Sequence, residues 1–458
     1  MADLVKAENI LADILAGKPV KYDDEKIEGN LNLDQLKDDR GRAHIPVPIE
    51  ITNSNIGTDV NFNNAVFEEA VSFSGSKFYK SEIDFGGACF RKDAEFSEAE
   101  FGNANFSGAE FQLNANFKKA KFVGEGIIDF RDAQFNGVAD FTEADLIAAD
   151  FHRAQFSGNA NFGHAQFKED ADFRVSQFNG YTSFNNIKLS GDISFALARF
   201  SFYANFSDTN FGGNASFMST HFFCNANFGY SRFSGYADFV SAVFSGDADF
   251  IKVEFDSDAK FDNAKFGGNA EFSWAKFKAD AHFQNVEFDY RLALNNLKFD
   301  RLYITWPSIK NSLVYDGPTY LALIKNFKII ERFGDADDCD YQYRKASQDH
   351  KRLYSGERGW DLSKLSDIAS CVSCGYGNRP IHTVICMFCI VVIGWIFFIG
   401  SSESLFESFY FSVMTFTGGD PDNLTLGRGL RTVAMIEAIF GYLLMALFVV
   451  VLGRKLIR

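Results

Sequence analysis

The stretch that decides the fold is ANFSDTNFGGNASFMSTHF, residues 204–222, in which A-x-F-x-x-x-x-F-x-x-x begins to repeat. The phenylalanines are spaced alternately by five and by six positions, and one spacing of each kind makes up the repeat unit. Neither a helical stripe of period 3.6 nor a strand face of period 2 can hold this spacing, because five is odd. Two phenylalanine series and one alanine series follow the unit: Phe206, Phe217, Phe228, Phe239, Phe250, Phe261, Phe272, Phe283; Phe211, Phe222, Phe233, Phe244, Phe255, Phe266, Phe277, Phe288; Ala204, Ala215, Ala226, Ala237, Ala248, Ala259, Ala270, Ala281.

A coil that turns a corner after each short side satisfies this spacing. Each central phenylalanine points inward and stacks on the one a coil away, and the alanine two positions earlier also points inward, where only a methyl group fits. The pattern resembles that of the pentapeptide-repeat family, and the resemblance covers residues 56–303. It implies a right-handed quadrilateral β-helix with one repeat per side. Four sides make a coil of about 22 residues, and about 11 coils at about 4.8 Å each make a rod about 50 Å long.

The sequence before the repeat predicts a cap. Residues 1–55 begin with apolar side chains at helical spacing that end at Gly17, and a short alternating segment follows. A repeat array needs an atypical terminal unit, because an open edge would pair with another chain. We therefore expect an N-terminal helix and cap.

The sequence after the repeat predicts a helical connector, residues 304–378. Trp306-Pro307 breaks the repeat, and two helices are expected to follow, the second with acidic residues first and basic residues last, which suits the helix dipole. The apolar stripe from Trp360 to Ile368 predicts an interfacial segment on the membrane surface.

Residues 379–458 have the composition of a membrane domain. A first apolar run, about 381–399, contains no Asp, Glu, Lys or Arg and as a helix is about 28 Å long, close to the thickness of a bilayer's hydrocarbon core. A second run covers about 430–452. Between them, residues about 404–420 carry apolar side chains at helical spacing and end in a glycine pair and an aspartate. Two spans around a half-helix and a glycine-rich turn outline a pore-loop hairpin.

A second resemblance rests on this hairpin. The run from Phe409 to Thr417, FYFSVMTFT, resembles the pore helix and filter entrance of two-transmembrane potassium channels. Gly427-Arg428, Glu437, Gly441 and the ending from Leu447 to Lys455 resemble the inner helix of that family. The resemblance covers the whole hairpin, and it departs at the filter. The family continues T-V-G-Y-G-D, whereas only GGD follows the last threonine here, so potassium selectivity is not carried over.

The resemblance implies a passive cation channel that is a homo-oligomer, with four copies favoured, and not an enzyme. No cofactor is expected, only permeant K⁺ or Na⁺. Backbone carbonyls of the filter would replace part of the ion's hydration shell, and aspartates would form acidic rings at the pore mouth. We expect modest selectivity for potassium over sodium. The expected filter and pore-mouth residues are Thr415, Phe416, Thr417, Gly418, Gly419, Asp420 and Asp422.

Two inner-helix residues allow alternative interpretations. Glu437 is a carboxylate within a span, which is costly unless it is buried against a partner, such as a pore-helix hydroxyl or an outer-loop arginine. Gly441 could be a gating hinge or a point of close helix packing.

The segment before the first span offers two sharper hypotheses. Cys371 and Cys374 could form half of a zinc site, with Cys386 and Cys389 as the other half, although the second pair lies within the apolar run. Gly375-Tyr376-Gly377 looks like the missing filter, but no pore helix precedes it. A turn at the membrane surface is the simpler interpretation.

Charge and composition limit the partners. The net charge is −15, and most of the excess lies in the repeat, which argues against a nucleic-acid-binding surface. An acidic rod could imitate DNA, bind another protein, or be a solvated scaffold. Arg379 before the first span, and Arg454 and Lys455 after the second, predict a multi-pass protein of the cell membrane, with the β-helix and C-terminus in the cytoplasm. In a channel, the β-helix could have a gating or sensing role. The alternative function is a non-conducting, membrane-tethered β-helix scaffold that binds a protein partner.

Overall fold

The computed structural model of the chain describes residues 4–57, 59–78, 82–124, 126–350, 354–355, 359–360, 362–401, 404–419 and 427–456. The chain divides into two compact units, Met1–Val314 and Tyr315–Arg458. The first unit consists mainly of short strands, and the second is mainly helical.

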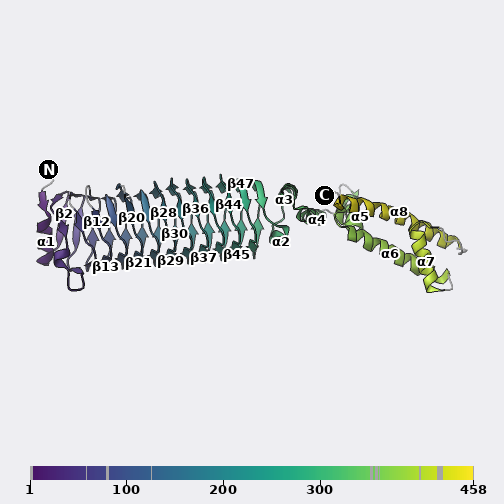
Figure 1. Cartoon of the computed structure of the whole chain (residues 1–458), viewed down its shortest axis with the longest axis horizontal. Coiled ribbons are helices and arrows are strands. Elements are labelled where there is room, and N and C mark those ends of the chain that lie inside the picture. The colour runs from purple at the N-terminus through teal and green to yellow at the C-terminus, as the bar shows by residue number, and fades with distance from the viewer. Residues whose placement is uncertain are drawn as a thin grey trace. The chain divides into compact units, whose positions relative to one another are not determined.

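The first unit is a β-solenoid, and Figure 1 shows its strands stacked coil upon coil from purple to teal. Equivalent strands of successive coils pair in parallel, with Ala204 opposite Ala226 and Phe211 opposite Phe233, so one regular coil contains two repeat units. The solenoid predicted from the phenylalanine spacing is thus confirmed. One coil consists of β33 (Arg199–Phe200), β34 (Ala204–Asn205), β35 (Asn210–Phe211) and β36 (Ala215–Ser216).

Stacked phenylalanine rings fill the interior of the solenoid. Phe217, Phe239 and Phe261 are fully buried, and their ring centroids follow one another at 4.8 Å with the planes within 2° of parallel. Neighbouring stacks meet edge to face, as Phe217 and Phe228 do at 5.2 Å and 89°. Each buried phenylalanine contributes about 1.5–3 kcal/mol of transfer free energy, and each favourable ring pair adds about 0.5–1.5 kcal/mol. The core is therefore a continuous aromatic column.

Residues in the left-handed backbone conformation form the corners of the coils. A positive φ recurs once in each repeat unit, as at Asp208, Ser219 and Tyr230, where φ is 56°, 55° and 62°. Side chains brace these turns: the Asn205 Oδ1 atom accepts a hydrogen bond of 3.1 Å from the backbone N–H of Ser207. Most of these corner residues are not glycine, so the surrounding coils hold the backbone in a conformation that L-residues seldom adopt.

The solenoid begins well before residue 56. One of its sheets contains 13 strands and another 12, which corresponds to about 13 coils. β2 (Val20–Asp23) pairs with β6 (Ile49–Thr52), and β3 (Lys26–Glu28) pairs with β7 (Asn55–Ile56). Isoleucine, leucine and valine replace phenylalanine inside these first coils. The helix α1 (Ala7–Leu15) buries one side against them, so the predicted cap consists of a helix together with additional coils.

A short apolar segment covers the other end of the solenoid. After β50 (Lys298–Tyr303), α2 (Trp306–Ile309) buries both its first and its last residue. The Thr305 Oγ1 atom accepts the backbone N–H of Ser308 at 3.4 Å and so caps this turn. Trp306-Pro307 therefore ends the repeat by forming a lid over the last phenylalanines.

The second unit contains the connector and the hairpin. The Asp316 carboxylate caps α3 by accepting the N–H of Thr319 at 3.1 Å, and α3 packs against α4 through buried residues that include Phe327 and Cys339. Tyr354–Ser355 and Gly359–Trp360 form a short antiparallel pair. The long helices are α3 (Gly317–Ile329), α4 (Phe333–His350), α5 (Leu362–Cys374), α6 (Pro380–Phe398), α7 (Leu405–Phe416) and α8 (Arg428–Leu456).

Candidate functional site

Two helices of the second unit, α6 and α8, are long and apolar enough to cross a membrane by their length and composition. Each has a mean hydropathy of 2.5 over its most apolar window. Pro380 lies in the first turn of α6, where its missing N–H removes no helical hydrogen bond. The shorter helix α7 contacts both of them. This three-helix hairpin is the candidate site.

The start of α7 is fixed to the end of α6. The Ser404 hydroxyl accepts the backbone N–H groups of Phe406 and Glu407 at 3.2 and 3.3 Å, which satisfies two donors of the first turn. The Trp395 indole donates to the carbonyl of Leu405 at 3.0 Å. Since α7 has 12 residues, it is about 18 Å long, roughly half of a bilayer crossing.

The end of α7 is a Schellman cap. Gly418 has φ +79°, and its N–H donates to the Thr415 carbonyl at 3.1 Å. The N–H of Gly419 donates to the Met414 carbonyl at 2.8 Å. These two hydrogen bonds define the motif, and glycine suits the left-handed position because it has no Cβ. The glycine pair therefore closes the helix with a tight turn.

This cap changes what the expected filter residues can do. Thr415 and Phe416 lie in the last turn of α7 and not in an extended filter, because the Schellman bonds keep the chain helical to that point. The Thr415 carbonyl already accepts a hydrogen bond, and the Phe416 carbonyl faces α8. Within the part of the chain that the structure describes, the carbonyls of Thr417, Gly418 and Gly419 make no such contact. Asp420 and Asp422 lie outside the described residues.

Glu437 connects all three helices of the hairpin. Its side chain is buried, 4% exposed, and its Oε1 atom accepts a short hydrogen bond from the Ser412 hydroxyl of α7. The Ser412 Oγ atom also lies 2.8 Å from the carbonyl of Val391 in α6. A Cβ on Gly394 would lie 2.3 Å from Oε1, so only glycine leaves room there for the carboxylate. Of the partners that the sequence left open, Glu437 thus bonds a hydroxyl, that of Ser412 in α7.

Gly441 lies where α8 crosses the end of α7. A Cβ built on it would be 2.0 Å from the Phe416 carbonyl oxygen, far inside van der Waals contact. Gly441 is therefore a close-packing point. Sequence reasoning did not identify Gly394, Val391 or Trp395, because their roles depend on which helix faces which.

A compact turn before α6 joins the connector to the hairpin. Gly375, Tyr376 and Gly377 all have positive φ, at 55°, 59° and 82°. The Tyr376 hydroxyl donates to Gln348 of α4 at 2.7 Å. The next residue, Asn378, donates to Asp340 of α4 at 2.8 Å. This segment is thus a corner that docks α4 beside the start of α6, as expected for a turn and unlike an extended filter.

The four candidate zinc ligands do not come together. Cys374 and Cys386 direct their thiols to the backbone carbonyls of Ser370 and Val372, each at 3.3 Å. Cys371 lies beside the Tyr341 hydroxyl, and Cys389 is exposed. Across the part of the chain that the structure describes, no three His, Cys, Asp or Glu side chains are grouped closely enough to hold a metal ion.

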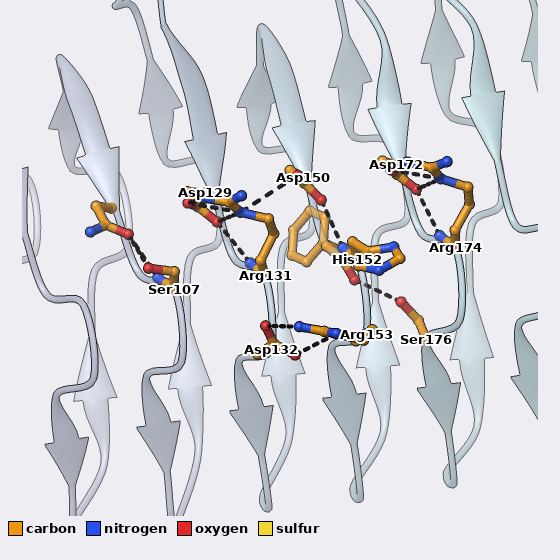
Figure 2. A network of polar contacts seen from close by, with 12 residues as sticks. Ser107, Asp129, Arg131, Asp132, Asp150, His152, Arg153, Asp172, Arg174 and Ser176 are labelled. Carbon is orange, nitrogen blue, oxygen red and sulfur yellow. Dashed lines mark hydrogen bonds and ion pairs between the residues drawn. The ribbon is translucent and has the colours of Figure 1, made fainter.

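The solenoid carries an in-register row of aspartates, which Figure 2 shows. Asp129, Asp150 and Asp172 lie opposite one another in β20 (Ile127–Asp129), β24 (Ala148–Asp150) and β28 (Ala171–Asp172). Arginines two positions further along neutralise the outer two, and they pair with the nearer carboxylates at 2.5 and 2.6 Å. The acidic face is therefore partly neutralised within the chain.

Asp150, in the middle of this row, differs from its neighbours. Its pKa is raised, mainly because burial disfavours the charged form and partly through repulsion by Asp172 and Asp129. Nearby, Arg153 donates two hydrogen bonds of 2.7 Å to Asp132 and lowers the pKa of that carboxyl (Figure 2). Two aspartates of the same region thus have opposite pKa shifts, and the partly buried carboxylate of Asp150 is the one whose charge costs free energy.

Comparison with known proteins identifies the repeats. A family model described as "Pentapeptide repeats (9 copies)" matches residues 51–100, 96–145, 148–188 and 228–273. These segments all lie within the solenoid, so the chain carries pentapeptide repeats folded as a β-solenoid. No curated protein and no solved structure matches the chain.

Proposed function

We propose that the protein is an oligomeric cation channel, in which copies of the α6–α8 hairpin surround a shared ion path. One hairpin cannot enclose a path, so several copies are needed, and four is the number that the resemblance to potassium channels implies. Ions pass the glycine turn at the end of α7. The solenoid is a cytoplasmic domain of this channel, attached through α3, α4 and α5.

The observation that carries this proposal is that a short half-helix, α7, packs one buried side against two helices of spanning length. Ser412 and Glu437 fix α7 from the side, while Ser404 caps its start. A helix that ends within the membrane directs its partial negative charge toward that point, which favours a cation there. A non-helical backbone at membrane depth is tolerated where it lines a water-filled path, as the turn at Gly418 would.

The glycine turn supports weak ion selectivity. A selective filter replaces the hydration shell of the ion with several rings of carbonyl oxygens. Here the carbonyls of Thr415 and Phe416 are directed into the cap and toward α8, which leaves Thr417, Gly418 and Gly419 to contact an ion. With so few ligands the ion keeps much of its water, and potassium and sodium are poorly distinguished.

Reconstitution of the purified full chain in planar lipid bilayers tests conduction. Unitary currents are expected from the unmodified protein. Ser412→Ala removes the hydrogen bonds to Glu437 and Val391 without adding bulk to the buried site, and should abolish or strongly reduce these currents. The control is Thr432→Val, because the Thr432 hydroxyl donates within its own helix, to the Arg428 carbonyl at 3.2 Å. Silence of the unmodified chain would refute the proposal.

A membrane-tethered scaffold is the second candidate function. It is favoured by the row of aspartates along the solenoid, because an ordered acidic face can recognise a basic protein partner. The two candidate functions differ in whether the purified protein gives unitary currents. A scaffold gives no unitary current under any voltage or ion gradient, whereas a channel conducts without any partner.

A further inference from the structure

The inference concerns Tyr442, which lies on α8 directly after Gly441 and touches the glycine turn. A Cβ built on Gly418 would be 2.0 Å from the Tyr442 Oη atom and 2.5 Å from its Cζ atom. The end of the tyrosine ring thus occupies the place where a side chain of residue 418 would lie. The sequence pattern contained no indication of this contact, because it joins two different helices.

Gly418 is the residue on which the shape of the turn depends. It holds the left-handed conformation, φ +79°, that closes the Schellman cap. Two consecutive glycines have more conformational freedom than any other pair of residues, so Gly418-Gly419 have little intrinsic preference for this one shape. An ion site needs its ligands fixed to within about 0.5 Å. Some contact from outside the turn must therefore restrain it.

Two successive residues of α8 supply contacts on either side of Thr417. The Phe416 carbonyl oxygen packs against Gly441, and the end of the Tyr442 ring packs against Gly418. Thr417, between them, is held by its own hydroxyl, which donates to the Val413 carbonyl at 2.9 Å. Hence α8 contacts the turn on both sides of Thr417. The backbone conformation of Gly418 then sets the direction of the Thr417 carbonyl.

We propose that Tyr442 is a positioning residue of the ion path: its ring tip holds Gly418 in the left-handed conformation and so fixes the carbonyls of Thr417 and Gly418. Thr417, Gly418 and Gly419 carry no aromatic side chain, so an aromatic residue of α8 supports the turn from outside. This inference rests on the proposed channel function, and it assigns the degree of ion discrimination to a residue that does not itself contact the ion.

A double-mutant cycle on the full chain tests the contact itself. Gly418→Ala, Tyr442→Ala and the double variant are compared with the unmodified protein by denaturation in detergent. Gly418→Ala introduces both a clash and the cost of a positive φ, but the φ cost is the same with or without the tyrosine and cancels in the cycle. We expect Gly418→Ala to change the unfolding equilibrium less once Tyr442 is truncated, by about twofold or more. Strictly additive effects would overturn the contact.

Bilayer recordings of the same variants test the role. Tyr442→Ala should change the K⁺/Na⁺ permeability ratio by about twofold or more, because the carbonyls of Thr417 and Gly418 lose the contact that fixes their positions. Tyr442→Phe keeps the ring and should remain closer to the unmodified protein. The matched control is Leu443→Ala, the next residue of α8, whose side chain is 61% exposed and should leave the ratio unchanged.

The experiments distinguish failure of the role proposed for Tyr442 from failure of the channel proposal. Unmodified protein that conducts, together with an unchanged permeability ratio in Tyr442→Ala, would overturn this inference and leave the channel proposal standing. Unmodified protein that never conducts would overturn both, even if the double-mutant cycle shows that tyrosine and glycine are coupled.

Discussion

Asp150 offers the clearest prediction for a single residue, because burial holds its pKa above the ordinary value. A carboxyl whose folded-state pKa is raised destabilises the fold once it ionises, so its cost is present at neutral pH and vanishes in acid. Asp150→Asn should therefore raise the thermal unfolding midpoint of the solenoid at neutral pH. The gain should shrink as the pH falls through the folded-state pKa, and circular dichroism would follow both.

Asp132 is the matched control with the opposite sign. Its pKa is lowered by Arg153, so it contributes stability above its unfolded-state pKa and loses it as the pH falls through the folded-state value. Asp132→Asn should lower the unfolding midpoint at neutral pH. The loss in the free energy of unfolding should be no more than about 1 kcal/mol, because the pair is exposed. The same sign for both variants at neutral pH would contradict this electrostatic account.

Val175 is a strained corner residue of the solenoid. Its φ is 63°, and a β-branched side chain is poorly suited to the left-handed region. Val175→Asn should stabilise the solenoid by about 1 kcal/mol, because asparagine tolerates this conformation. Val138→Asn replaces another exposed valine that has no positive φ and should give no such gain in a denaturation experiment.

Among the elements, α8 contains two glycines, Gly441 and Gly453, whose replacement by alanine should have opposite effects on stability. At Gly441 an added methyl would lie 2.0 Å from the Phe416 carbonyl oxygen, whereas Gly453 has no atom within 4 Å of that position. Gly441→Ala should destabilise the hairpin by about 1–3 kcal/mol, as overpacking does. Gly453→Ala should be neutral or stabilising by up to about 1 kcal/mol, because alanine is the better helix former. Denaturation in detergent measures both.

The same pair of variants tests the hinge hypothesis for Gly441. A hinge glycine is needed for motion, so its replacement would change open probability in single-channel recordings. A glycine needed only for packing would change stability and leave the gating of the surviving channels as it was. We expect the second pattern, because the Phe416 carbonyl already fills the space beside Gly441.

At this scale, the sequence predicted where helices occur better than how they end. The apolar runs located α6 and α8, and the helical spacing after Ser404 located α7. The pattern assigns all the carbonyls of residues 415–419 to the ion, because a glycine pair fits both a filter and a helix cap. The difference lies in hydrogen bonds from Gly418 and Gly419 to earlier carbonyls, and a linear pattern does not reveal those bonds.

For the whole molecule, the predictable part is the regular part. Phenylalanines such as Phe217 revealed the coils because a ring stacked on a ring requires strict spacing. The first coils escaped the pattern because β-branched and leucine side chains fill the same interior positions. One early coil, from Val20 to Ile49, is also longer than a regular coil such as Ala204 to Ala226. Contacts such as that of Glu437 with Gly394 depend on helix packing, which one sequence does not encode in any local pattern.

Coupling between the solenoid and the hairpin is tested by removing the solenoid. The connector helix α4 holds the start of α6, since Asn378 bonds Asp340 at 2.8 Å and Arg379 lies over the Tyr341 ring at 3.9 Å. A chain lacking Met1–Val314 should therefore keep its unitary conductance, which the hairpin sets, and change its open probability. Identical gating under all stimuli tried would show that the solenoid has no sensory role.

The central claim is that ions pass the glycine turn with weak discrimination, and ion replacement in planar bilayers tests it most directly. With potassium on one side of the membrane and sodium on the other, the account predicts unitary cation currents whose reversal potential lies between zero and that of an ideal potassium electrode. The absence of unitary currents, a reversal potential that follows chloride, or one that matches the ideal potassium electrode would contradict it.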